Sequence, residues 1–127
     1  MRYTLDSDKP VEKLLEDTRQ AVQDNKFGVL NVLDLQATLK SKGFDLTSPC
    51  YILDVCNPAQ AINVLNEDLD MNIALPCRMS VYAENGKSRL AMIKPTALLA
   101  GLSDSPSLAK IAEEVEQTMM RIMEQAR

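Results

Sequence analysis

Residues 77–94 read CRMSVYAENGKSRLAMIK, and they contain the strongest structural signal in the chain. Asn85-Gly86 is the preferred dipeptide for a two-residue type I′ turn, so it predicts a β-hairpin. In that register Tyr82 faces Arg89 on one side of the hairpin. The apolar pairs share the other side: Val81 with Leu90, and Met79 with Met92. The hairpin therefore predicts an antiparallel sheet with one apolar face.

Strand and helix patterns alternate before this hairpin, and a helix pattern follows it. We expect strands over 1–6, 28–33 and 50–55, alternating with helices over 8–25, 34–43 and 57–65. Candidate residues that begin these helices are Asp8, Asp34 and Asn57, and Gln60 is placed to reach back in a capping box. Ser105-Pro106 begins the last helix, whose apolar residues recur at helical spacing as far as Ala126.

The predicted order is β-α-β-α-β-α-β-β-α, which indicates an α+β fold. A chain of 127 residues suits one domain, here residues 1–127. We expect a mainly antiparallel sheet with helices packed on one face, the last helix lying across it. The chain has only five aromatic residues but seven methionines, so its core should be aliphatic and rich in Met.

Composition argues against several classes of partner. The net charge is −4, and no basic run is interleaved with aromatic residues, so we expect no nucleic-acid binding. No apolar stretch approaches the ~18 residues of a spanning helix, and the first residues contain no apolar signal sequence. Three cysteines without a secretion signal indicate reduced thiols. We therefore expect a cytoplasmic protein that does not bind a membrane.

Two cysteines beside prolines form the candidate site. Cys56 directly precedes Asn57, the predicted start of a helix, where the helix dipole would lower the pKa of the thiol. Cys77 has Arg78 next to it, and extension of the hairpin register places Lys94 opposite, so nearby cations would also lower its pKa. The commoner alternative for each thiol is an unreactive apolar side chain in the core.

Other candidates are weaker. Cys50 lies at the far end of the same predicted strand as Cys56. We expect it to be an unreactive side chain that packs in the core. The chain has no histidine and no close cysteine pair, so we expect no zinc site and no other cofactor. Asp34 is more simply a helix cap and Asp54 a solvated strand residue, so no acid–base catalytic pair is predicted.

Two stretches give the chain a family resemblance. They are Tyr51-Ile52-Leu53-Asp54-Val55-Cys56-Asn57-Pro58, followed by Ala59 and Ala61, and Leu75-Pro76-Cys77-Arg78-Met79-Ser80-Val81-Tyr82. Phe27-Gly28-Val29 and Thr38-Leu39-Lys40, before Gly43, add to the likeness, which runs from about Thr4 to Pro95. The chain resembles the domain of unknown function 302 (DUF302) family. The resemblance implies an α+β domain similar to the TATA-binding-protein-like architecture, and a small homodimer, but it implies no particular reaction.

Two functions remain open. The first is a homodimer that binds a small ligand or a partner without catalysis, because a concave space between helix and sheet is a common ligand site. The second is a thiol protein that uses Cys56 and Cys77 in redox chemistry, sulfur transfer or the handling of soft metals. The prevalence of buried structural cysteines favours the first.

Overall fold

A computed structural model describes all residues from 1 to 127 and places a five-stranded sheet at the centre of the molecule. The strand order is β1-β5-β4-β3-β2, and every neighbouring pair is antiparallel. The strands are β1 (Arg2–Ser7), β2 (Gly28–Asp34), β3 (Cys50–Cys56), β4 (Cys77–Glu84) and β5 (Lys87–Ile93). The predicted α+β class and antiparallel sheet are confirmed.

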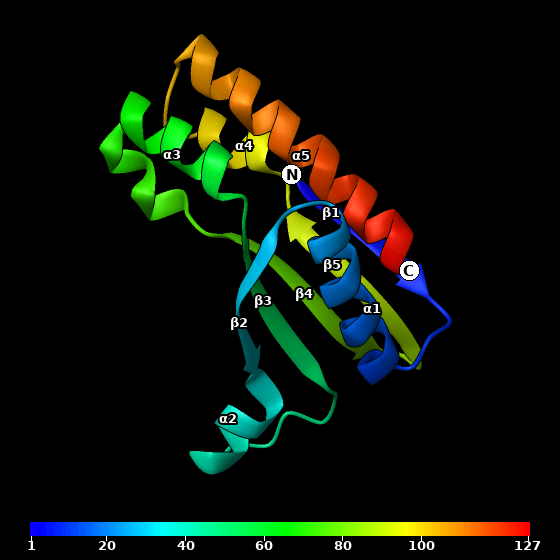
Figure 1. Cartoon of the computed structure of the whole chain (residues 1–127). Helices are drawn as coiled ribbons and strands as arrows, with labels where there is room; N and C mark the ends of the chain where they lie inside the picture. Colours follow the sequence, from blue (N-terminus) through cyan, green and yellow to red (C-terminus); the bar gives the residue numbers. More distant parts are fainter.

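The helices lie in three places around this sheet (Figure 1). Two of them, α1 (Val11–Asp24) and α5 (Pro106–Ala126), lie on the same face. Three shorter segments gather at one end of the sheet: α3 (Pro58–Glu67), the 3₁₀ helix η1 (Leu69–Ala74) and α4 (Pro95–Ala100). The remaining helix, α2 (Leu35–Ser41), extends beyond the opposite end. None of these helices combines the length and the apolar character needed to cross a membrane.

The apolar side chains form two packed clusters. The larger one joins alternate residues of the central strands to α1 and α5, as the alternation in the sequence predicts. Leu53, Met79 and Leu90 in it are fully buried. The smaller cluster lies beyond the sheet and joins α3, η1, α4 and the first half of α5: Val64, Met71, Leu99, Leu108 and Ala112. The long helix α5 therefore contributes to both clusters.

The hairpin forms in the predicted register. Tyr82 pairs with Arg89, and the apolar pairs Val81–Leu90 and Met79–Met92 point to the helix-covered face. Asn85 and Gly86 have φ values of 53° and 78°, the left-handed pair that a type I′ turn requires. The turn residues therefore fix the pairing of β4 with β5.

Three of the helices have the side-chain N-caps that the sequence predicts. The Ala37 N–H donates to Asp34 at 2.9 Å, the Gln60 N–H to Asn57 at 3.2 Å, and the Leu108 N–H to Ser105 at 3.3 Å. Each bond satisfies an amide that has no partner within its own helix. These caps set where α2, α3 and α5 begin.

Two predictions about helix starts are wrong. Asp8 does not cap α1; Pro10 occupies the N-cap position without a side-chain hydrogen bond, and Asp8 lies 3.6 Å from Lys87 in an exposed ion pair. Gln60 does not close a capping box, because its side-chain amide donates to Glu114 on α5 at 3.2 Å. In both cases a residue distant in sequence competes for the side chain.

Two short helical segments were not predicted. Pro95 directly follows the predicted hairpin, and it is the first residue of α4. Asp68, just beyond the predicted end of the preceding helix, begins η1 by accepting from the Asp70 N–H at 3.0 Å. Both segments pack through the smaller cluster, which local sequence patterns do not reveal.

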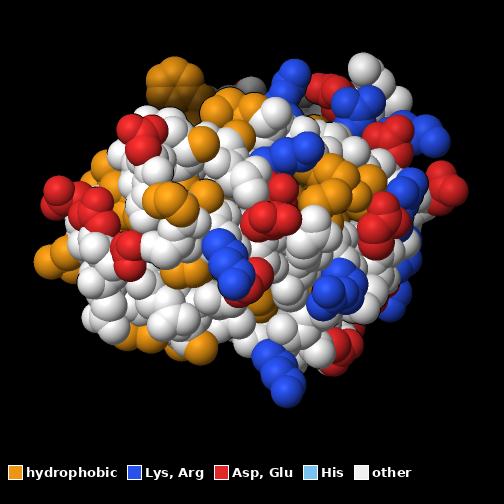
Figure 2. Space-filling model, turned by 90° about the horizontal axis from the view of Figure 1, so that it is seen from above, with side chains coloured by type: hydrophobic (Ala, Val, Ile, Leu, Met, Phe, Trp, Pro, Cys, Tyr) orange, Lys and Arg blue, Asp and Glu red, His pale blue; other side chains and the backbone are white.

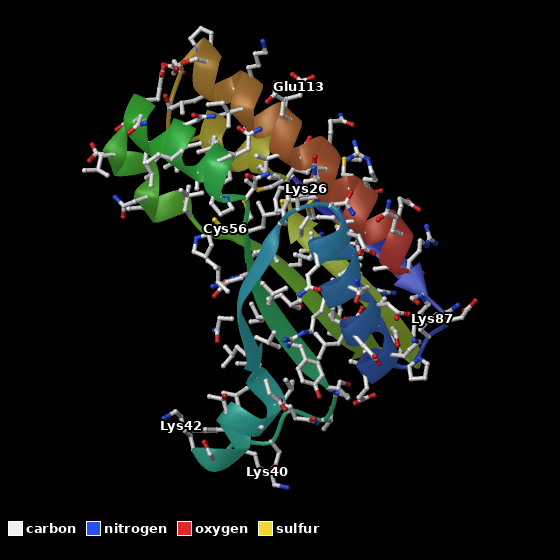
Figure 3. All side chains as sticks on the ribbon, in the orientation of Figure 1. Lys26, Lys40, Lys42, Cys56, Lys87 and Glu113 are labelled. Carbon is white, nitrogen blue, oxygen red and sulfur yellow. The ribbon has the colours of Figure 1, made fainter.

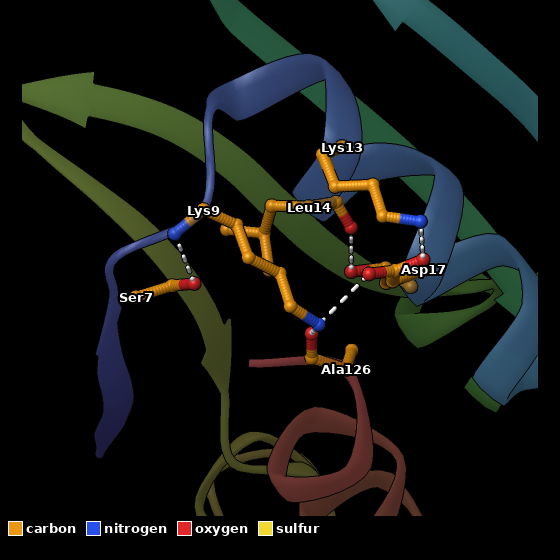
Figure 4. A network of polar contacts seen from close by, with 7 residues as sticks. Ser7, Lys9, Lys13, Leu14, Asp17 and Ala126 are labelled. Carbon is orange, nitrogen blue, oxygen red and sulfur yellow. Dashed lines mark hydrogen bonds and ion pairs between the residues drawn. The ribbon is translucent and has the colours of Figure 1, made fainter.

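A network of polar contacts joins the two helices on the sheet (Figure 4). The Lys9 ammonium lies 2.8 Å from the Asp17 carboxylate on α1 and donates to the Ala126 carbonyl at the end of α5 at 2.7 Å. Lys13 lies 3.1 Å from the same carboxylate. Hydrogen bonds from the two lysines hold the pKa of Asp17 below its usual range. The network therefore ties the end of α5 to α1.

We predict that Gly86→Ala destabilises the protein by about 1–2 kcal/mol, because an L-residue is strained in the left-handed region. The added methyl group would meet no atom within 4 Å, so the loss would be conformational rather than steric. The measurement is urea unfolding followed by circular dichroism. Gly101→Ala is the matched control: Gly101 has a right-handed helical conformation, so the change should be neutral or stabilising. Equal effects of the two variants would contradict the prediction.

Candidate functional site

A cavity of about 320 Å³ lies where the sheet meets the group of short helices. Residues that line it lie at the adjoining ends of β3, β4 and β5 and on α3, η1, α4 and α5. The apolar lining includes Phe27, Val64, Leu99, Ile111 and Val115. Ile111 packs against both apolar clusters, so the cavity lies at the junction between them.

Four of the five candidate site residues line this one cavity: Cys56, Asn57, Cys77 and Arg78. Lys94 is not part of the wall, although Ile93 and Pro95 on either side of it are. Cys77 pairs with Val55 on β3, whereas the β4–β5 register ends at Met79 and Met92. The Lys94 N–H donates instead to the carbonyl of Met1 at 2.8 Å. The expected ladder pair of Cys77 with Lys94 is therefore absent.

The end of one strand and the beginning of the next bring the two thiols to the wall. Cys56 is the last residue of β3, opposite Gly28, and the chain enters α3 directly after it (Figure 3). Cys77 is the first residue of β4, after the Leu75-Pro76 connection from η1. Because β3 and β4 are adjacent, these two strand ends lie at the same end of the sheet. Cys50, at the far end of β3, does not line the cavity.

Burial controls the chemistry of Cys77. Loss of solvent raises the pKa of this thiol to about 11, and the neighbouring Cys56 adds to the increase. The lowering that Arg78 and Lys94 were expected to cause is therefore wrong in direction. Near neutral pH Cys77 is a protonated thiol, and the protonated form is neither a good nucleophile nor a metal ligand.

Arg78 and Asp54 form the charged part of the wall. They are direct cross-strand partners, and the guanidinium Nε lies 3.9 Å from the carboxylate. The Arg78 side chain is 65% exposed, so water screens its charge from the buried Cys77. This exposure explains in part why the neighbouring cation does not activate the thiol.

Sequence reasoning missed most of the wall. Ile111, Ala112 and Val115 were read correctly as the apolar stripe of the last helix, but the stripe gave no sign that part of it borders empty space. Gln60 was assigned only a capping role, and Asp54 only a solvated position. No group of three or more His, Cys, Asp or Glu side chains is arranged to hold a metal ion.

Fold and cavity together define a small α+β domain with a mainly apolar pocket that is open to solvent. The family model for the domain of unknown function DUF302 matches residues 3–126, so the chain belongs to the DUF302 family. The chain is also similar to the crystal structure of an uncharacterised conserved DUF302 protein from Bacillus stearothermophilus. The two share 36% sequence identity with a TM-score of 0.93, and the match covers 99% of this chain and 98% of that one. A comparison with curated proteins found no match.

We predict that Cys77 reacts slowly with iodoacetamide in the folded protein, because alkylation requires the thiolate. In a Cys50→Ser, Cys56→Ser double variant, the labelling rate should still rise with pH toward a midpoint well above the ordinary pKa of cysteine, because burial, the larger cause of the increase, remains when Cys56 is removed. At pH 8 the folded variant should react at least tenfold more slowly than the same variant unfolded in urea. A midpoint at or below about 8.5, the ordinary value for cysteine, would contradict the prediction.

Proposed function

We propose that this protein binds a small, mainly apolar ligand in the cavity between the sheet and α3, α4 and α5, without catalysis. The observation that carries the proposal is the cavity itself, which has a volume of about 320 Å³. Binding pockets for small molecules have volumes of about 300–1,000 Å³ and combine an apolar lining with a few polar groups. This cavity lies at the lower end of that range and has the same mixed lining.

Its wall combines rigid parts with an apolar surface. Val64 and Leu99 are nearly fully buried on the helices around it, and Val55 is fully buried on the inner strand β3. Burial fixes their side chains, so a ligand would not have to order them. An apolar ligand would gain roughly 25 cal/mol for each Å² of apolar surface that it removes from water. These features support binding rather than a reaction.

A thiol function is the second candidate, and one observation favours it: Cys56 and Cys77 line the same cavity. Redox exchange, sulfur transfer and soft-metal binding all require a thiolate. The raised pKa of Cys77 weakens this candidate, since that thiol is protonated near neutral pH. Ligand binding is therefore the better supported of the two.

The test of ligand binding uses 1-aminoanthracene, a neutral probe whose fluorescence rises in apolar surroundings. We expect a saturable increase with the folded protein and none with the protein unfolded in urea. Ala61→Phe should weaken probe binding at least tenfold, because Ala61 lines the cavity on α3 and the larger side chain would occupy part of the space. A tenfold loss corresponds to about 1.4 kcal/mol of binding free energy.

The matched control is Ala109→Phe, which makes the same change at an exposed position of α5 outside the cavity wall. This variant should bind the probe as the unmodified protein does. Ligand binding in this cavity would be refuted by the absence of a saturable signal, or by equal affinity of the two variants.

We also propose that the protein acts as a homodimer in the cytoplasm. Supporting observations are the large apolar side chains that reach the surface: Phe44 beyond α2 and Leu30 on the edge strand β2 are 67% and 63% exposed. On the face seen in Figure 2, apolar side chains also reach the surface between acidic and basic ones. Pairing of two chains would remove such surface from water.

For the homodimer, we expect light scattering coupled to size-exclusion chromatography to give twice the chain mass of 14.1 kDa. The mass should remain double between about 0.1 and 1 M NaCl, because apolar contacts, unlike exposed ion pairs, are not screened by salt. A single-chain mass at 100 µM protein would refute the dimer.

A further inference from the structure

One long segment of the chain, residues 28–50, contains no buried residue. It comprises β2, α2 and the loop that leads to β3. We call residues 35–49, which are α2 and this loop, the arm; it extends beyond the end of the sheet (Figure 1). A helix of seven residues is too short to be stable alone in water, where even about 12 residues are marginal. The arm therefore lacks a core of its own to pack against.

The edge of the sheet beside the arm is open. β2 pairs only with β3, and no hydrogen bond of the turns, loops or caps involves the backbone of residues 28–33. Charged residues or proline usually protect such edges, but residues 28–33 read GVLNVL, and the bulge residue Leu30 is exposed. Edge and arm together offer 22 residues, 28–49, and each side of a standard interface has about 20–30.

The arm has a positive charge that nothing within the chain neutralises. Its charged residues are Lys40, Lys42 and Asp45, so its net charge is +1. Both lysines lie at the free end of α2 (Figure 3), and neither takes part in an ion pair. The arm thus combines exposed apolar residues such as Phe44 with unpaired cations.

The complementary charge lies at the other end of the sheet. Residues 58–74, which form α3 and η1 and which we call the acidic tip, contain Glu67, Asp68 and Asp70 but no Lys or Arg. The tip also exposes the large apolar side chains of Leu69 and Ile73. Arm and tip lie at opposite ends of the sheet (Figure 1), so they cannot meet within one chain.

Pairing of two copies through β2 brings arm and tip together. Identical edges that pair across a two-fold axis run antiparallel, because each copy offers the same surface. β2 begins at Gly28, opposite Cys56, where β3 leads into α3, and it ends at Asp34, where the arm begins. Antiparallel alignment therefore places the arm of each copy at the end of the sheet where its partner has the acidic tip.

We infer that the edge of β2 and the arm form the interface of a dimer, in which the arm of each copy contacts the acidic tip of the other. This inference rests on the proposed homodimer and adds the surface through which it forms. Apolar side chains of edge and arm supply the affinity, whereas the opposite charges fix the orientation of the two copies. A dimer of this kind remains associated at high salt.

The test reverses the charges on each side of the contact. Lys40→Glu, Lys42→Glu makes the arm acidic, and Glu67→Lys, Asp70→Lys makes the tip basic. Each double variant alone should have a dimer dissociation constant at least tenfold higher than that of the unmodified protein, because like charges then face each other. An equimolar mixture of the two should dimerise again, since each arm then meets a tip of opposite charge. Sedimentation equilibrium between about 1 and 100 µM measures both effects.

Two controls accompany this test. Lys110→Glu, Arg121→Glu reverses two charges at exposed positions of α5, outside the proposed interface, and should leave the dimer unchanged. Phe44→Asp should weaken the dimer at least tenfold, whereas Leu102→Asp, which makes a similar change at an exposed leucine between α4 and α5, should not.

The outcomes separate this interface from the homodimer on which it rests. If the unmodified protein has the mass of a single chain throughout, the homodimer itself is refuted. If it is a dimer but Phe44→Asp and the arm reversal leave it intact, the dimer forms through another surface. If the two reversal variants are monomers that do not associate when mixed, the contact between arm and acidic tip is wrong.

Discussion

Burial of one apolar face of the sheet under α1 and α5 is the interaction on which the other features depend. Leu53, Met79 and Leu90 on that face are fully buried, as are Met119 and Ile122 on α5. The helix has 21 residues and so extends about 30 Å. Its second half packs on the sheet, whereas its first half lies beyond the sheet and is covered by α3, η1 and α4. The cavity lies where packing against the sheet gives way to packing among helices.

Features set by neighbours in sequence could be predicted from the sequence. The Asn85-Gly86 turn fixed a register that the structure confirms, and Asn57 predicted the start of α3. Such signals operate over two to four residues, so distant packing rarely overrides them. Asp8 and the capping box of Gln60 were the exceptions, because the distant residues Lys87 and Glu114 interact with those two side chains. The fold class followed from these local elements.

The candidate site could be predicted only as a set of residues. Proline and strand-end positions identified Cys56 and Cys77, and the cavity brings both into one wall. The cavity itself depends on how α4 and α5 pack, which no short stretch of sequence encodes. The predicted lowering of the Cys77 pKa was wrong because two features of the tertiary structure decide that pKa. The Arg78 side chain is exposed to water, and the Cys77 thiol loses solvent on folding. Extension of the hairpin register to Lys94 failed because that residue's amide bonds to Met1.

The position of α5 in the chain, after every strand that it helps to cover, has a consequence for biosynthesis. A ribosome delivers the sheet strands first, and β5 emerges before the helix that covers much of its apolar face. Until residues of α5 leave the exit tunnel, α5 cannot cover Met79 and Leu90 on the nascent chain, and exposed apolar surface of this kind makes a partly folded chain prone to aggregation. Folding of this domain should therefore be completed only after α5 has been translated, and a ribosome stalled before α5 would present an incompletely covered sheet.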